Sequence, residues 1–376
     1  MKRQRRIHRD SKSFRAFLGN DRGSVMIMVT VGLVACFAFV VLAVETAILM
    51  TTRTQLHNAA DAAALAGASG LLEGSEATAT ERAIAIAGSN DAVQDGMQPV
   101  IITADDVTFP EPDICRVRTH RTVATGDPVR TFFRRVLDPS SSNTGDMTAV
   151  AAARWYDVCI TNCLKPWSVP DRWDDANANG IYDDGEYYDP DHTGFVAPVD
   201  VGAEIVLKVG NPQQAIEPGI FFPVNFPPLN NDYGENPLTG GDWYRQWISD
   251  CEPYPIGVGD QLQLEPGNMV GPTMQGMENL IAQDPNAYWD PVEQTIKNSN
   301  FAFSPRVGLI PFFDPRLPPS SGRNYVTVTK IAAFFIENVG PGSQVTGKFI
   351  QITTQGDPCE GSGTSDSFIK GIVLIE

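Results

Sequence analysis

Histidine is scarce in this sequence, and no catalytic motif accompanies it. The 376 residues include four histidines, His8, His57, His120 and His192. There is no His-Glu-x-x-His zinc motif, no Gly-x-Ser-x-Gly nucleophile motif and no phosphate-binding P-loop. The sequence therefore contains no recognisable catalytic motif for hydrolase or NTPase chemistry and identifies no small-molecule substrate. We predict that the protein is not an enzyme.

Basic residues are also in the minority, and they are unevenly placed. The chain has 28 Lys and Arg against 45 Asp and Glu, and its formal charge is −17. Eight of the bases precede Gly23, where only two aspartates accompany them, so this arm carries +6 and the remaining chain −23. A surface this acidic repels nucleic acid and anionic lipid. We therefore expect no nucleic-acid partner.

One long apolar run follows the basic arm, from Val25 to Val44. At about 1.5 Å per residue, its helix would span roughly 30 Å, the thickness of a bilayer's hydrocarbon core. A cleaved secretory signal also starts with bases, but its apolar core is usually only about 7–15 residues, and no small-x-small cleavage site follows here. The run is therefore interpreted as a membrane anchor, with the arm 1–23 in the cytoplasm and the remainder outside.

The helical pattern continues beyond the membrane. The segment from Glu45 to Ala68 lacks proline and is rich in alanine, which favours helix strongly. We predict one helix over 24–72. Small side chains on one face would let another helix or a sheet approach closely; that face holds Ile48, Gln55, Ala59, Ala63 and Ala66.

The cysteines are consistent with export. Cys36 lies in the membrane run, and the other five lie beyond it. An oxidising compartment favours disulfides, and an odd number leaves at least one thiol over or paired between chains. Cys159 and Cys163 have no second Cys/His pair with zinc spacing. They are expected to form disulfides with Cys251, with Cys359 or with each other.

Residues 78–158 have the pattern of a small α/β domain. Helices are predicted over Thr80–Gly88 and, after Asp127-Pro128, over Val129–Leu137. Strands are predicted over Ile114–Val123, which has period-2 alternation, and over Met147–Tyr156. A long helix on a small sheet is similar to pilins by analogy of fold only.

A twelve-residue segment from Asp175 to Glu186 has the pattern of an EF-hand-like calcium loop. Oxygen ligands fall at the required positions, Gly180 stands where the backbone must turn, and Glu186 can bind through both oxygens. The predicted ligands are Asp175, Asn177, Asn179, Ile181 through its carbonyl, Asp183 and Glu186. No flanking helices are evident, so we predict a structural calcium site with a Kd on the order of 10⁻⁴–10⁻³ M.

The distal region, 159–376, has the pattern of a β-rich domain. Strand-like runs occur at Ala203–Val209, Tyr325–Glu337, Gln344–Thr354 and Phe368–Ile375. Aromatic residues such as Trp243, Trp247, Tyr288 and Trp289 are more typical of core filling than of a carbohydrate-binding platform. The predicted fold class is therefore α+β: a long transmembrane helix, a small pilin-like α/β unit and a β-rich extracytoplasmic domain.

The segment around the helix also resembles a known family. Arg22-Gly-Ser-Val25, the apolar run and Gln55-Leu-His-Asn-Ala-Ala-Asp-Ala-Ala-Ala-Leu-Ala-Gly-Ala68 are similar to the N-terminus of TadG-like proteins of Tad (tight adherence, Flp) pilus-assembly systems. The resemblance covers residues 20–70 strongly and the next ninety weakly. It implies a non-catalytic envelope protein that assists assembly or anchoring of Flp pili. The Asp-x-Ser-x-Ser metal motif of some relatives is absent, so their adhesion chemistry is not expected.

These observations give a leading hypothesis and an alternative. The leading hypothesis is a single-pass protein of the bacterial inner membrane, with its C-terminal domain periplasmic or extracellular and with Tad/Flp pilus or assembly subunits as partners. The alternative is a calcium-dependent surface adhesin or binding module that shares the same anchor. Calcium binding by the fragment from residue 78 onward would be common to both, whereas a calcium-dependent surface ligand belongs only to the adhesin.

Overall fold

A computed structural model describes residues 21–72, 74–131, 140, 143–190, 192–209, 222–231, 234–319, 324–359 and 367–375. The chain forms two compact units. The first comprises residues up to Ala153 together with the last three residues, and the second comprises Arg154–Val373. The boundary falls within strand β7 (Met147–Thr161), which therefore contributes residues to both units. The α+β class, with a long apolar N-terminal helix and a β-rich remainder, is confirmed.

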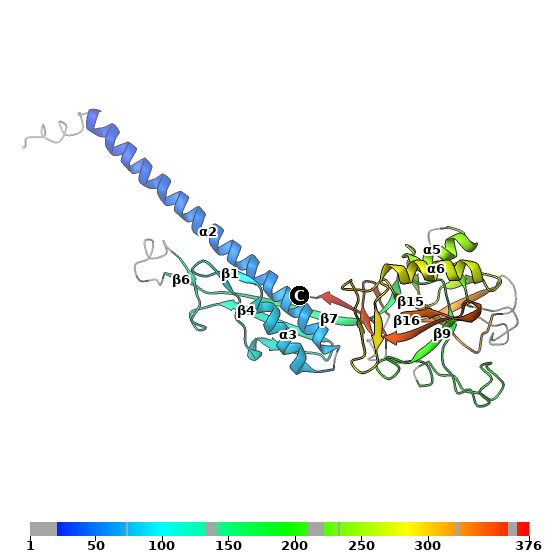
Figure 1. Cartoon of the computed structure of the whole chain (residues 1–376). Coiled ribbons are helices and arrows are strands. Elements are labelled where there is room, and N and C mark those ends of the chain that lie inside the picture. Colours follow the sequence, from blue (N-terminus) through cyan, green and yellow to red (C-terminus); the bar gives the residue numbers. More distant parts are fainter. Residues whose placement is uncertain are drawn as a thin grey trace, which may run out of the picture. The chain divides into compact units, whose positions relative to one another are not determined.

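Helix α2 (Asp21–Leu71) is the longest element of the first unit. By length and composition, its Val25–Leu71 part can cross a membrane, and the most apolar window has none of its residues buried in protein. Figure 1 shows this N-terminal half extending away from the rest of its unit. The apolar run therefore does not serve as a core helix in the structure.

The second half of α2 packs on α3 (Glu76–Gly88) and on strands of the first unit. Ser75 caps α3, accepting a hydrogen bond from the Thr78 N–H. The strands that lie wholly in this unit are β1 (Asp91–Val93), β2 (Met97–Pro99), β3 (Val107–Thr108), β4 (Ile114–Arg121), β5 (Val129–Arg130) and β6 (Thr144–Gly145). A 3-10 turn, η1 (Ala104–Asp106), precedes β3. The strand predicted from Ile114 is present, and the one predicted from Met147 extends to Thr161.

The helix predicted over Val129–Leu137 is wrong at its start. Val129 and Arg130 form β5, antiparallel to β6. Val129 is buried, and the Arg130 and Thr131 N–H groups donate to the carbonyls of Gln94 and Asn143. These donors are used between segments distant in sequence, which overrides the local proline signal. Residues 132–139 lie outside the described part of the chain.

The second unit is built around a seven-stranded sheet. Long strands β15 (Val307–Phe313), β16 (Tyr325–Val339) and β17 (Val345–Ile350) pair antiparallel at its centre. The sheet is completed by β8 (Val169–Pro170), β9 (Glu204–Lys208), β10 (Val224–Asn225) and β12 (Gln261–Leu264). Helices α5 (Gly241–Ser249) and α6 (Val270–Gln283) pack together over the β15–β16 region (Figure 1). The strands predicted from 203 and 368 are present in shorter form, the one from Tyr325 extends two residues further to Val339, and the run from 344 forms two strands, β17 and β18 (Ile352–Thr353).

The remaining strands and a 3-10 turn lie outside this sheet. They are β11 (Ile256–Gly257), β13 (Tyr288–Asp290), β14 (Thr295–Lys297), β18 (Ile352–Thr353), β19 (Asp357–Pro358), β20 (Ile369–Leu374) and the 3-10 turn η3 (Pro341–Ser343). Of these, β11 and β19 pair with β7. Two disulfides join Cys159 to Cys359 and Cys163 to Cys251, and Cys115 is a free buried thiol. Disulfide formation by Cys159 and Cys163 is thereby confirmed, and of the pairings left open the structure shows those with the two distal cysteines. Among the five cysteines that follow the apolar run, Cys115 is the one left without a disulfide.

Candidate functional site

The C-terminal half of α2 is fixed to its own unit by polar and apolar contacts. Leu56, Ala59, Ala60, Ala63 and Ala64 have no exposed surface. The Val93 N–H donates to Gln55 Oε1 (3.0 Å). The Thr119 hydroxyl donates to the Leu56 carbonyl (2.9 Å). The small-residue face predicted from the sequence is therefore the face on which α3 and the strands of this unit pack.

Two glycines show how close this approach is. A Cβ on Gly67 would lie 2.3 Å from Cys115 Sγ, and one on Gly70 would lie 2.5 Å from the Ala79 Cα. Contacts under 3.0 Å require something to shift, and at Gly70 the obstacle is backbone. The Gly67 and Gly70 positions of the Ala-rich segment are therefore set by packing against β4 and α3.

The same segment also has an outward face. Asn58 is exposed and Asp61 is half-buried, three residues apart on α2. Residues spaced by three or four share one side of a helix. Asn58 and Asp61 are therefore two polar residues of the Ala-rich segment that remain accessible to solvent in the structure.

The comparison with protein families falls on this helix. Residues 23–70 match the model of the Tad family, described as Flp pilus-assembly TadE/G-like. The match confirms the resemblance noted in the sequence and indicates an assembly role, and it covers the membrane run and its Ala-rich continuation. No curated protein and no solved structure matches the chain.

The predicted calcium loop lies in the second unit. Asp174 and Tyr187, the residues on either side of the loop, pair with each other in a β-bridge. Gly180 has a φ of +74°, the left-handed conformation that favours glycine. Buried Asp171 fastens the base of the segment by accepting from the Phe195 N–H (2.9 Å) and from Lys330 Nζ (2.9 Å). The loop is thus closed at its base on the β-rich unit.

Five of the predicted ligands take part in hydrogen bonds within the loop. Asp175 accepts from the Asn179 and Gly180 N–H groups, at 3.2 and 2.8 Å. Asp183 Oδ2 accepts from the side-chain amides of Asn177 and Asn179, both at 2.8 Å. The Ile181 N–H donates to Asn179 Oδ1 (2.7 Å). The structure therefore brings together the side chains of the first, third, fifth and ninth loop positions, with the amide nitrogens of Asn177 and Asn179 directed at Asp183.

Glu186 is held on the other side of the loop. Its Oε1 accepts from the Ala176 N–H (3.0 Å), and its Oε2 accepts from the Asp183 N–H (3.1 Å) and the Trp173 indole (2.9 Å). The Trp173 ring meets Tyr182 edge to face, and the Tyr182 hydroxyl donates to the Glu186 carbonyl. Trp173 is therefore placed to report any movement of the Glu186 carboxylate.

The donor set has the chemistry that calcium prefers. Carboxylate, amide and carbonyl oxygens are hard ligands suited to Ca²⁺. Among the residues that the structure describes, no three His, Cys, Asp or Glu side chains form a group that could hold a metal ion. The loop's three carboxylates, Asp175, Asp183 and Glu186, thus do not converge by themselves, and Asn177, Asn179 and the Ile181 carbonyl would supply the remaining oxygens.

The structure also brings together a charged group in the first unit that the sequence analysis did not single out. Asp106 accepts hydrogen bonds from Arg118 and from His120 Nε2, the latter at 3.1 Å. Burial opposes ionisation of Asp106, but hydrogen bonds from Thr103, Arg118 and His120 outweigh it and lower its pKa. A hollow of about 580 Å³ borders this group. The alternation of β4 places Arg118 and His120 on one face, but no local pattern pairs them with Asp106.

Proposed function

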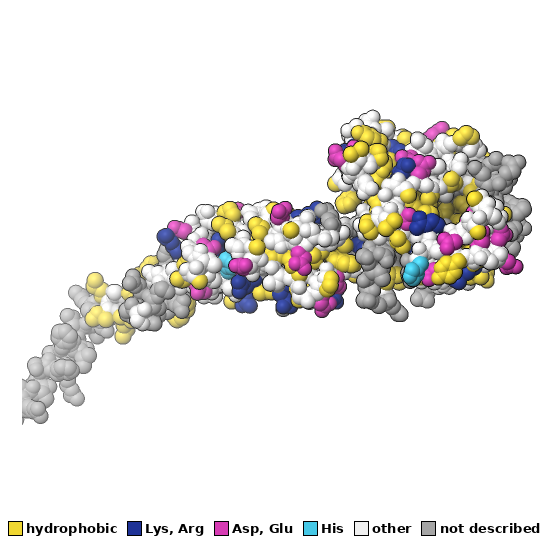
Figure 2. Space-filling model, turned by 90° about the horizontal axis from the view of Figure 1, so that it is seen from below, with side chains coloured by type: hydrophobic (Ala, Val, Ile, Leu, Met, Phe, Trp, Pro, Cys, Tyr) yellow, Lys and Arg dark blue, Asp and Glu magenta, His cyan; other side chains and the backbone are white. Residues whose placement is uncertain are grey.

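We propose that this protein is a non-enzymatic, single-pass component of Flp pilus assembly or anchoring in the inner membrane. The observation that carries the proposal is the family match at residues 23–70, which coincides with the exposed apolar run and its packed extension. The excess of bases before the apolar run supports a cytoplasmic N-terminus. The two folded units then project from the outer side, and acidic side chains are spread over the face of each unit seen in Figure 2.

The open side of the Ala-rich segment is the proposed contact for other assembly or pilus subunits. Asn58 and Asp61 lie there, whereas the opposite side is occupied by the protein's own first unit. A partner helix that packs against this side would need polar groups opposite these two residues. The contact is therefore confined to a short stretch just outside the membrane.

Affinity purification from native membranes tests this proposal. A tagged full-length chain should retain Tad membrane or pilus components, and Asn58→Arg should reduce their recovery about tenfold by placing a long charged side chain in the contact. Gln98→Arg makes the same amide-to-Arg change at an exposed residue outside the matched segment and should have no effect. Equal recovery with both variants would remove the proposed contact, and no recovery with the wild type would remove the partner assignment.

We propose further that calcium binds the loop Asp175–Glu186 and stabilises the second unit. The support is the donor set and the hydrogen-bonded convergence of Asp175, Asn177, Asn179 and Asp183. A bound cation would draw in the third carboxylate, Glu186, in place of its hydrogen bonds to Ala176, Asp183 and Trp173. Its role would be structural, because the loop is closed on a sheet and is not flanked by a movable helix pair.

Calorimetric calcium titration with thermal unfolding tests the loop. At tenfold excess over Kd, calcium should stabilise the second unit by about 1.4 kcal/mol, a rise in Tm of a few degrees. Glu186→Gln should abolish both the heat and the stabilisation. Asp184→Asn removes one charge from an exposed loop residue outside the ligand set and should retain both. Binding that survives Glu186→Gln, or no binding by the wild type, would contradict the site.

The adhesin alternative gains no specific support from the aromatic residues. Trp247 and Trp289 are 2% and 9% exposed and belong to the hydrophobic core of the second unit. Trp243 and Tyr288 are 41% and 49% exposed. Most of the aromatic surface in this region is thus used for packing, so the assembly role remains the function we propose.

A further inference from the structure

The disulfide Cys163–Cys251 lies in an unusual chemical setting in the second unit. Cys251 is exposed and follows the end of α5, whereas Cys163 is half-buried and follows the end of β7. Both half-cystines line a hollow of about 330 Å³, which is also lined by Lys165, Asp250 and Gln283. A thiol from solution can therefore approach this pair without the sheet opening.

Lys165 supplies a cation at this hollow. Its ammonium donates to the Ile248 carbonyl (2.8 Å) and the Asp250 carbonyl (3.1 Å) at the end of α5. Burial lowers the pKa of Lys165 to about 8, while Asp250 acts in the opposite direction, so Lys165 is charged at neutral pH. A neighbouring cation favours a cysteine thiolate, and a thiol of low pKa is the better leaving group in disulfide exchange.

Two carboxylates near the pair act against a thiolate. Asp250 precedes Cys251 and Glu252 follows it. Glu252 is fully buried, and burial raises its pKa to about 7 despite hydrogen bonds that it accepts from neighbouring N–H groups. Its negative charge is therefore incomplete at neutral pH. Of the two charged residues that line the hollow, Lys165 and Asp250, only Lys165 favours a thiolate.

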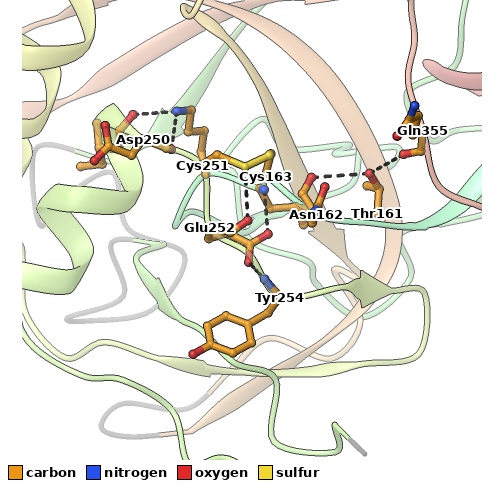
Figure 3. Close-up of a disulfide and its surroundings, with 11 residues drawn as sticks. Thr161, Asn162, Cys163, Asp250, Cys251, Glu252, Tyr254 and Gln355 are labelled. Carbon is orange, nitrogen blue, oxygen red and sulfur yellow. Dashed lines mark hydrogen bonds between the residues drawn. A yellow bond between two sulfur atoms is a disulfide. The ribbon is translucent and has the colours of Figure 1, made fainter. Parts of the chain in front are cut away.

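The two chain segments that carry Cys163 and Cys251 are also joined by hydrogen bonds that do not involve the sulfur atoms. Figure 3 shows Glu252 beside the disulfide, with its carboxylate directed toward Tyr254. Glu252 accepts from the Leu164 N–H (3.0 Å) and the Tyr254 N–H (2.6 Å), and the Cys163 N–H donates to the Glu252 carbonyl (3.0 Å). These bonds join the two segments without the sulfur atoms.

We propose that Cys163–Cys251 is a thiol–disulfide exchange site for a dithiol reductant. One thiolate of the dithiol attacks Sγ of Cys251, the S–S bond breaks, and Cys163 leaves as a thiolate beside the Lys165 cation. The second thiolate of the dithiol then attacks its own sulfur in the mixed disulfide and releases the Cys251 thiolate. The protein disulfide gains two electrons, the dithiol becomes a disulfide, and each released thiolate takes its proton from solvent.

The second disulfide is an internal reference for this proposal. Cys159 lies within β7, and the Cys359 N–H donates to the Asp157 carbonyl, so this bridge continues a paired strand segment. A thiol that opens it must act within the β7–β19 pairing. Exchange is therefore expected first at Cys163–Cys251.

Timed reduction of the full-length protein in detergent tests the site. Dithiothreitol at pH 7, followed by alkylation and peptide mass spectrometry, gives a separate opening rate for each disulfide. Cys163–Cys251 should open at least about tenfold faster than Cys159–Cys359, at a rate proportional to the dithiothreitol concentration. Lys165→Met should slow that opening about three- to tenfold and leave Cys159–Cys359 unchanged, whereas Lys165→Arg, which keeps a cation, should slow it less.

Several results of the same experiment would contradict the proposed exchange site. Equal rates for the two disulfides, or faster opening of Cys159–Cys359, would overturn the assignment of the exchange site to Cys163–Cys251. A rate that does not depend on dithiothreitol would show that reduction follows unfolding of the unit. Tryptophan fluorescence distinguishes the two situations, because all six tryptophans lie within Arg154–Val373 and would report unfolding. If Lys165→Met fails to fold, the rate ratio in the wild type decides the proposal.

Discussion

The two units use opposite means of packing. The first is built from small side chains: its described core consists of alanines, a few β-branched and leucine residues and Cys115, with no aromatic ring among them. The second buries Trp167, Tyr244 and a series of phenylalanines, and it holds both disulfides. Close backbone approach stabilises the first unit, whereas large apolar area and covalent links stabilise the second.

The two units also differ in charge, and the second is the more negative. The second unit has 12 bases and 28 acids, a formal charge of −16, while residues 24–153 carry eight bases and 14 acids, or −6. Self-repulsion is therefore greatest where the fold has aromatic packing and disulfides to oppose it. The first unit holds the second half of the long helix α2, which contains the apolar run, and the second combines its greater negative charge with an aromatic core and both disulfides.

Phe349→Ala is expected to cause the largest loss of stability. This ring packs against Phe195, Phe312, Phe334 and Phe368. Removing a fully buried ring should lower the free energy of unfolding of the second unit by about 3–5 kcal/mol. Urea unfolding followed by tryptophan fluorescence measures this loss. Alkylation of buried Cys115 should stay slow, because Cys115 reports only the first unit; fast alkylation would show that the two units do not unfold separately.

Gly70→Ala should damage the first unit instead. The added Cβ meets the Ala79 backbone at 2.5 Å, so α2 and α3 must separate, at a cost of about 2–4 kcal/mol. Cys115 should then be alkylated much faster while tryptophan fluorescence is unchanged. Gly88→Ala, where nothing lies within 4 Å, is the control and should leave Cys115 protected. Equal effects of the two substitutions would contradict the close-approach interpretation.

Glu252→Gln should change how the second unit responds to pH. Burial raises the Glu252 pKa from 4.5 to about 7, so the folded state binds this proton more tightly than the unfolded state. Glu252 is therefore expected to lower stability as pH rises from about 4.5 to about 7, by roughly 1–3 kcal/mol in total. Lys165, whose pKa is about 8, titrates above this range.

The measurement is the difference between the urea stabilities of Glu252→Gln and the wild type at several pH values. The variant should lack the decline over this range, and Glu278→Gln, at an exposed position of α6, should retain it. A decline that persists in Glu252→Gln would assign the pH dependence to other groups.

The smallest effect is expected at the cap of α3. Ser75 Oγ accepts from the Thr78 N–H, and Ser75→Ala should destabilise the first unit by about 1 kcal/mol. Cys115 alkylation should accelerate about fivefold, since it follows the equilibrium opening of this unit. Ser75→Asp, which keeps a capping oxygen, should not accelerate it. No change with Ser75→Ala would show that the cap contributes nothing measurable.

Local patterns predicted much of the fold, and non-local contacts account for what they missed. The apolar run, the Ala-rich continuation and the long strands of the second unit carry strong periodic signals. The helix expected from Val129 failed because its N–H groups are used by Gln94 and Asn143. The calcium ligands were found because they lie within twelve residues, and their loading stays a prediction. No local sequence pattern predicted that Glu252 and Lys165 would be buried, since their burial depends on contacts with α5 and with segments distant in the sequence.

The central claim is that the α2 helix makes this chain a pilus-assembly component. Counting Flp pili by electron microscopy in a deletion strain, complemented with the full-length chain or with Asn58→Arg, tests it most directly. The account predicts few or no pili in the deletion strain, restoration by the wild type, and little restoration by the variant at equal protein level. Normal piliation of the deletion strain would contradict it.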